Sequence, residues 1–190
     1  MISNNANVTD KVAASVQKIA GVDGGAKLGG VFHFQCFDAN GNLKWEDSTH
    51  NLVVNEGLKD LNDKYFSGST YTATWYLGLV NASPSPSYAA GDTLASHAGW
   101  AETTDYSGNR KAVTFGAATT ADPSVISNTA APSQFSMTGT VTVAGAFLTN
   151  VATGTSGVLF SVSSFGSPGD RSVVSGDTLS VTYQFSADAA

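Results

Sequence analysis

The sequence predicts a mainly β protein: an antiparallel, jelly-roll-like β-sandwich with one inserted α-helix and a short helical N-terminal arm. Apolar and polar residues alternate in several strand-sized runs, most strictly in the last run at Leu179, Val181, Tyr183 and Phe185. Glycine, proline, asparagine and aspartate separate these runs at short intervals, which is typical of an antiparallel sandwich or barrel. Only one segment after the arm has convincing helical spacing.

Residues 1–30 form a predicted arm with a glycine-rich hinge, and residues 31–190 form the predicted β-sandwich domain. Thr9 is a suitable cap for a helix of about eleven residues. The apolar stripe of this helix contains Val12, Val16, Ile19 and Ala20. A helix this short is marginal alone in water. We therefore expect Val12, Val16 and Ile19 to be interface residues, either on the chain's own domain or on a neighbouring subunit.

The β-domain is predicted to begin with a hairpin. Val31–Phe37 alternates with period two, and a return strand starts at Leu43. Between them lies Asp38–Asn42, an Asn-Gly turn. The same residues imitate the start of a calcium loop, but Leu43 and Thr49 occupy the positions that require glycine and glutamate. The sequence therefore favours a hairpin turn over a calcium site.

The inserted helix lies in residues 51–80. Asn55 is a candidate helix cap. The helix is expected to bury one face, made of Leu58, Leu61, Tyr65 and Phe66. Glu56 lies in the first turn, where the helix dipole stabilises negative charge. A well-buried strand is predicted over Thr74–Val80.

A long connection, Asn81–Trp100, follows that strand. Pro84 and Pro86 exclude a central strand there. Loops of this length usually carry function or are held by a partner, so Tyr88 within it is a candidate interface residue. Further strands are predicted over Arg110–Phe115, Gln134–Met137, Thr140–Leu148, Gly157–Ser163 and Asp177–Phe185.

Composition excludes several classes of function. The net charge is −6 and the basic residues are scattered, which argues against nucleic-acid binding. Charged residues make up 13% of the chain against about 25% in ordinary domains, as in secreted β-rich proteins or in subunits covered by neighbours. No apolar run is long enough for a membrane span, and no leader peptide is recognisable. The single cysteine, Cys36, is expected to be a buried apolar residue in a protein folded in a reducing cytoplasm.

No catalytic, cofactor or metal site is predicted. His33, His50 and His97 lack the spacing of metal ligands. Carboxylates such as Glu46 and Glu102 fall at strand ends, where solvated roles suffice. We therefore expect the chain not to be an enzyme. The aromatic residues suit a core, a subunit interface or a sugar-binding groove.

Four blocks of sequence resemble a set of tailed-bacteriophage virion structural proteins. The first two blocks are NLVVNEGLKDLNDKYFSGSTYTATWYLGLV (51–80) and GDTLASHAGWAETTDYSGNRKAVTF (91–115). The third is VAGAFL (143–148), and the closing block is GDTLSVTY (176–183). The resemblance covers about residues 31–185 and leaves the arm unmatched.

This resemblance implies a head decoration, or cement, protein that binds the assembled capsid and stabilises it by bridging capsid subunits. The implied partners are the major capsid protein and further copies of the chain, as a dimer or trimer, without nucleic acid or membrane. The implied location is the exterior of the capsid, after synthesis in the cytoplasm of the host bacterium. The alternatives are a tail, neck or fibre protein of the virion, or a carbohydrate-binding adhesin module.

Overall fold

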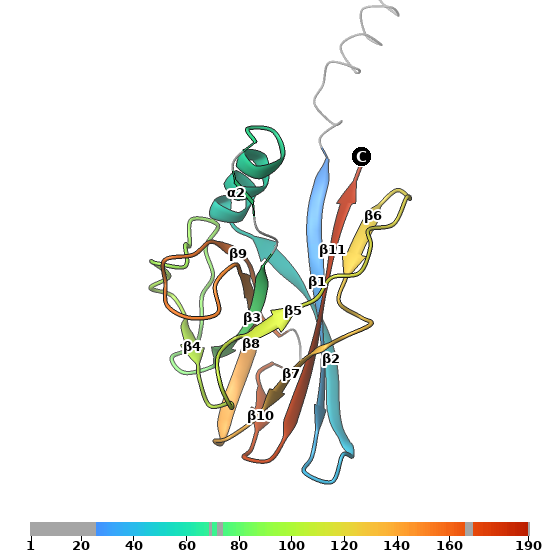
Figure 1. Cartoon of the computed structure of the whole chain (residues 1–190). Helices are drawn as coiled ribbons and strands as arrows, with labels where there is room; N and C mark the ends of the chain where they lie inside the picture. The colour runs from blue at the N-terminus through green and yellow to red at the C-terminus, as the bar shows by residue number, and fades with distance from the viewer. Residues whose placement is uncertain (1–25, 69, 72–73, 166–168, 190) are drawn as a thin grey trace, which may run out of the picture.

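The computed structural model describes residues 26–68, 70–71, 74–165 and 169–189. They form a mainly β fold, one large antiparallel sheet of 11 strands with a single helix among the described residues, α2 (Asn55–Tyr65). The sheet is not closed: its strand order runs β4-β3-β8-β9-β2-β1-β11-β6, with β10 beside β8, β5 beside β3 and β7 beside β11 (Figure 1). None of the helical residues in this part of the chain forms a stretch long and apolar enough to cross a membrane.

Five of the described strands have seven residues or more, and the other six have three to five. The long ones are β1 (Lys27–Phe37), β2 (Leu43–Val53), β3 (Trp75–Asn81), β8 (Val141–Thr149) and β11 (Thr178–Asp188). The shorter ones are β4 (Ala101–Thr103), β5 (Lys111–Val113), β6 (Ser124–Ser127), β7 (Ser133–Ser136), β9 (Leu159–Ser163) and β10 (Arg171–Val173).

The predicted first hairpin is confirmed. β1 pairs with β2, and the Asp38 carboxylate accepts hydrogen bonds from the backbone amides of Asn40 and Asn42 at 2.8 and 2.9 Å. The Asn42 side-chain amide also donates to the carboxylate at 3.0 Å, and this bond, followed by the backbone bonds, lowers the pKa of Asp38. Gly41 has a φ of 84°, the left-handed conformation that an Asn-Gly turn supplies. The carboxylate is therefore used to close the turn.

The β-domain begins earlier than predicted. Lys27–Gly30 belongs to β1 and pairs with Phe185–Asp188 of β11, so Gly29 and Gly30 are not part of a flexible hinge. At Gly30 an added Cβ would lie 2.5 Å from the Gln184 carbonyl oxygen and 2.9 Å from the Tyr183 hydroxyl oxygen, so the missing side chain makes room for both. Residues 1–25 of the predicted arm, including Val12, Val16 and Ile19, lie outside the described residues.

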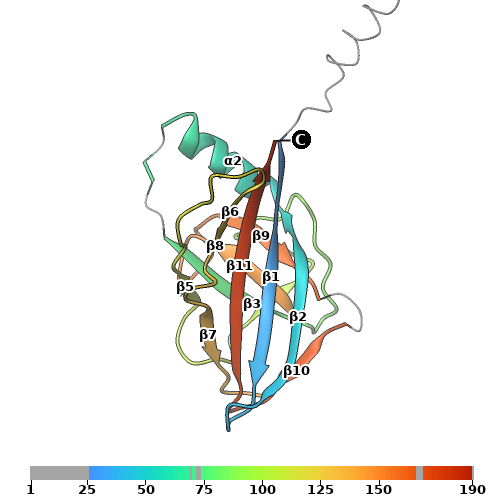
Figure 2. The ribbon, with the colours of Figure 1, turned by 90° about the vertical axis from the view of Figure 1, so that its right-hand side faces the viewer.

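The sheet folds over so that its two halves share one core. β2 joins them, because it pairs with β1 along most of its length and with β9 at its end. In Figure 2, β1 and β11 lie in front of β3 and β8. Their buried side chains belong to one core, among them Phe32, Leu77, Leu148 and Val181. Cys36 is fully buried in this core, as predicted. A second cluster lies around Trp100.

The helix occupies the predicted residues but is held differently. Its N-cap is Val54, without a side-chain capping bond, so the prediction for Asn55 is wrong. The predicted buried face is right only in part: Leu61 packs against the core, but Tyr65 and Phe66 are 81% and 76% exposed, and the one fully buried residue of the helix is Gly57. The first turn of the helix packs closely on β9, and the helix extends from there beyond the end of the sheet (Figure 1).

Candidate functional site

The first two sequence blocks meet at one carboxylate. The Glu56 Oε2 atom accepts hydrogen bonds from the Leu94 amide at 3.1 Å and the Leu159 amide at 2.7 Å. These bonds tie the start of α2 both to the 81–100 connection and to β9. Gly57 follows, and a Cβ there would overlap the Phe160 backbone, 2.8 Å from its Cα. Glu56 and Gly57 therefore fix the helix against the sheet.

The second block folds around Trp100, which is 4% exposed. The indole Nε1 donates to the Asp92 carboxylate at 3.0 Å, and the same oxygen accepts the Ala89 amide at 3.0 Å. The His97 ring stacks on the indole with centroids 4.0 Å apart, and Phe147 of the third block lies 5.2 Å away. The long connection is thus anchored from within the chain.

An ion pair continues this network. The Arg110 guanidinium donates to both Glu102 oxygens at 2.9 and 2.7 Å and to the carbonyls of Val151 and Gly154. The Tyr106 hydroxyl donates to Glu102 at 3.3 Å. Burial, and then the charge of Glu102, raises the pKa of Tyr106. All of these polar groups therefore bond to one another inside the fold.

The closing block contains a third internal contact. Asp177 is buried, pairs with the Lys44 ammonium at 2.5 Å and accepts the Val174 amide at 2.9 Å. The Cys36 thiol lies 3.8 Å from the same carboxylate. Burial and the Asp177 charge together raise the pKa of Cys36 to about 11, so the thiol is protonated at neutral pH.

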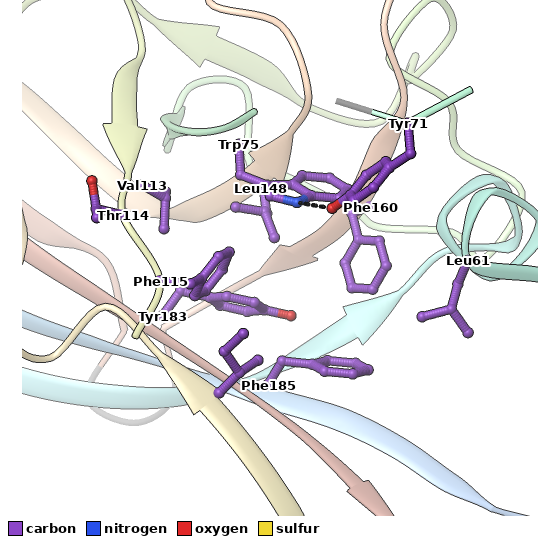
Figure 3. A pocket seen from close by; sticks show the side chains of 11 residues that line it. Leu61, Tyr71, Trp75, Val113, Thr114, Phe115, Leu148, Phe160, Tyr183 and Phe185 are labelled. Carbon is purple, nitrogen blue, oxygen red and sulfur yellow. Dashed lines mark hydrogen bonds between the residues drawn. The ribbon is translucent and has the colours of Figure 1, made fainter. Parts of the chain in front are cut away.

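An apolar cleft of about 480 Å³ opens beside α2, between side chains of β3 and β8 on one side and of β11 on the other. Figure 3 shows its aromatic side chains facing one another across the opening. We call it the aromatic cleft, and its lining is Leu61, Tyr71, Trp75, Val113, Thr114, Phe115, Ile126, Leu148, Phe160, Tyr183 and Phe185.

The aromatic cleft offers few polar groups. The Trp75 Nε1 already donates to the Tyr71 hydroxyl at 3.2 Å, and the Tyr183 hydroxyl receives bonds from Asn51 and Ser161. Burial raises the pKa of Tyr183, so it remains a neutral phenol. A cleft of this kind suits an apolar occupant, because a polar one would find few hydrogen-bond partners there.

An exposed aromatic ridge borders the cleft. It consists of Tyr65, Phe66 and Tyr71, which are 81%, 76% and 52% exposed. The rings of Tyr65 and Phe66 meet edge to face with centroids 4.9 Å apart. Tyr65 and Tyr71 line a smaller hollow that shares Leu61 and Phe160 with the aromatic cleft. Clustered exposed aromatic side chains are typical of a partner-binding surface.

The other predicted site residues lie elsewhere. Tyr88 is half-buried, with its ring 6.3 Å from Trp100, and burial raises its pKa to about 12. It lies away from the aromatic cleft's lining, and its role in an interface stays a prediction. His33 bonds Ser48 at 2.7 Å on the outer face of the β1–β2 hairpin, as expected for a strand histidine. In the described part of the chain no three histidine, cysteine, aspartate or glutamate side chains gather as a metal site would require.

Sequence reasoning missed the aromatic cleft because its walls come from separate parts of the chain. α2, β3, β5, β6, β8, β9 and β11 each contribute one or two side chains, and no local motif joins them. Comparison of the chain with protein-family models, with curated proteins and with solved structures finds no match. Function must therefore be inferred from the residues and their arrangement.

Proposed function

We propose that this chain is a tailed-bacteriophage head decoration protein that binds the assembled capsid and stabilises it by bridging capsid subunits. Its partners in this proposal are the major capsid protein and further copies of itself, on the exterior of the head. Because many copies bind one shell, individually weak contacts add to a large total stabilisation.

The resemblance in the sequence blocks supports the proposal, and the contacts among those blocks strengthen it. Glu56 of the first block bonds to Leu94 of the second, and Arg110 of the second lies over the Phe147 ring of the third, 5.2 Å from its centroid. Blocks that contact one another in the fold define a shared framework rather than four unrelated strings.

We also propose that the two facing halves of the sheet form a jelly-roll-like sandwich.

The observation that carries the proposed role is the aromatic ridge. Tyr65, Phe66 and Tyr71 expose apolar rings on a protein whose charged content is only 13%. Burying such rings against another protein yields roughly 25 cal/mol for each Å² removed from water. We therefore assign the α2 end of the subunit as the face that contacts the shell.

The test measures binding to purified, tail-free heads that lack this protein. The double variant Tyr65→Ser/Phe66→Ser removes most of the ridge, whereas Leu43→Ser removes a 50%-exposed apolar side chain at the β1–β2 turn, the opposite end of the sheet (Figure 1). We expect the ridge variant to bind at least about tenfold more weakly, a loss of ~1.4 kcal/mol, and the control to bind as the wild type.

Two results would contradict the proposal. Equal binding of both variants would remove the ridge from the interface. Failure of the wild-type chain to bind heads, with mass spectrometry locating it in isolated tails, would favour a tail, neck or fibre protein instead.

A further inference from the structure

The aromatic cleft is an apolar surface left open by the described part of the chain. Its base is well buried, with Leu148 2% and Phe160 7% exposed, while Thr114 and Tyr71 at its rim are exposed. An apolar hollow of 480 Å³ is large enough to receive several side chains at once. An apolar surface of this size is usually covered by a further segment of the chain or by a partner.

The chain enters the sheet beside this cleft. Phe185 lines the cleft and pairs with Gly30 of β1, and β1 begins three residues earlier, at Lys27, opposite Asp188. At about 3.3 Å per residue, the start of β1 is roughly 10 Å from the level of Phe185. Leu28 is half-buried and pairs with Ala187 in this same stretch.

The segment before Lys27 carries a matching apolar stripe within reach. Val12, Val16 and Ile19 have the spacing of one helical face, and residues 20–26 separate them from β1. Seven extended residues span up to roughly 23 Å, about twice the 10 Å needed to return to the cleft. Gly21, Gly24 and Gly25 in this connector permit the reversal of direction.

We propose that the aromatic cleft binds the N-terminal segment of the same chain, with Val12, Val16 and Ile19 inserted among Trp75, Phe160 and Phe185. The tether favours the same chain over a second copy. A short flexible linker gives an effective concentration in the millimolar range, far above that of free subunits in dilute solution. Docking also stabilises a helix that is too short to persist alone. The inference does not depend on the proposed role in a virion.

Cross-linking between introduced cysteines tests this placement. Cys36 is fully buried and its pKa is raised to about 11, so it stays unreactive while introduced thiols are modified. The test variant combines Val16→Cys with Thr114→Cys at the exposed rim. Its matched control combines Lys18→Cys, a polar position outside the apolar stripe of the predicted helix, with the same Thr114→Cys.

With a short bis-maleimide reagent, we expect the Val16→Cys pair to form an intramolecular link at least about tenfold faster than the Lys18→Cys pair, in proportion to their effective concentrations. Links that join two chains, seen as a covalent dimer, would assign the occupant to a second copy and overturn the proposal. Equal rates for the two pairs would show that the stripe does not face the cleft.

A dye that fluoresces on apolar surfaces gives an independent measurement. The variant Val12→Ser/Val16→Ser/Ile19→Ser should uncover the aromatic cleft and raise dye fluorescence severalfold, whereas Lys18→Ser should leave it unchanged. Unaltered fluorescence in the triple variant would refute the docking. Head binding by the same variants is measured separately, so failure of this inference is distinguishable from failure of the proposed function.

Discussion

Replacing Glu56 by alanine is expected to destabilise the fold more than any change at an ordinary helix surface position. The Glu56 carboxylate is the acceptor for two backbone amides, those of Leu94 and Leu159. Both leucines are 0% exposed, so water cannot simply replace the lost oxygen. The substitution therefore leaves two buried donors without their partner.

The magnitude follows from these two contacts. A buried donor without an acceptor costs about 1–3 kcal/mol. Removing negative charge from the first helical turn adds about 0.5 kcal/mol. Because Glu56 itself is half-buried, some water reaches the two amides, and the cost per amide falls in the lower half of this 1–3 kcal/mol range. We expect a loss of about 3 kcal/mol, a large share of the ~5–15 kcal/mol that stabilises a typical domain.

Urea unfolding followed by tryptophan fluorescence measures this loss. With an m value of ~2 kcal/mol/M, the midpoint of Glu56→Ala should fall by ~1.5 M. Glu56→Gln keeps an oxygen acceptor and should lose less than half as much. Glu46→Ala, an exposed glutamate with one 3.4 Å contact to Gln35, should stay within ~0.5 kcal/mol of wild type. A midpoint for Glu56→Ala equal to that of Glu46→Ala would refute the reasoning.

Two further predictions concern close packing and pH. Gly57→Ala should lower the thermal midpoint by the equivalent of ~1–3 kcal/mol, because the added methyl group would overlap the Phe160 backbone. This loss is expected although alanine favours helices over glycine. Asn62→Ala on the exposed side of the helix is the control, and a gain in stability for Gly57→Ala would contradict the contact. The free energy of unfolding should also fall between about pH 9 and 11. Burial raises the pKa of Cys36 from 9.0 to about 11 and also raises the pKa of Tyr183, so the unfolded chain loses these protons at lower pH than the folded chain. A urea midpoint that stays unchanged across this range would show that folding raises the pKa of neither group.

Period-two alternation predicted the long strands well. The alternating run at the C-terminus became β11, and the runs at the start of the domain became the β1–β2 hairpin. The strands that the sequence did not predict, β4, β6 and β10, are three or four residues long. Such strands contain at most two alternations, and their pairing is decided by a neighbour that is distant in the sequence.

For the helix, the sequence predicted the element correctly but only some of its buried residues. Leu61, Tyr65 and Phe66 have the spacing of a buried stripe, yet only Leu61 packs against the core, and the residue that the structure buries fully is Gly57. A residue without a side chain contributes nothing to a hydrophobic pattern, so close backbone packing is invisible to periodicity. The two aromatic residues of the stripe that stay exposed, Tyr65 and Phe66, form the aromatic ridge together with Tyr71.

Some of the charged side chains of the chain stabilise the fold rather than its surface. Three ion pairs connect separate parts of the sheet and are partly or largely buried: Lys44–Asp177, Arg110–Glu102 and Arg171–Asp47. These three pairs use six of the 24 charged side chains of the chain. Replacing one residue of such a pair lowers the free energy of unfolding, because the remaining charge is left poorly solvated. The polar residues of the sequence blocks therefore stabilise the framework, whereas the apolar residues outside the core form the surface suited to binding another protein.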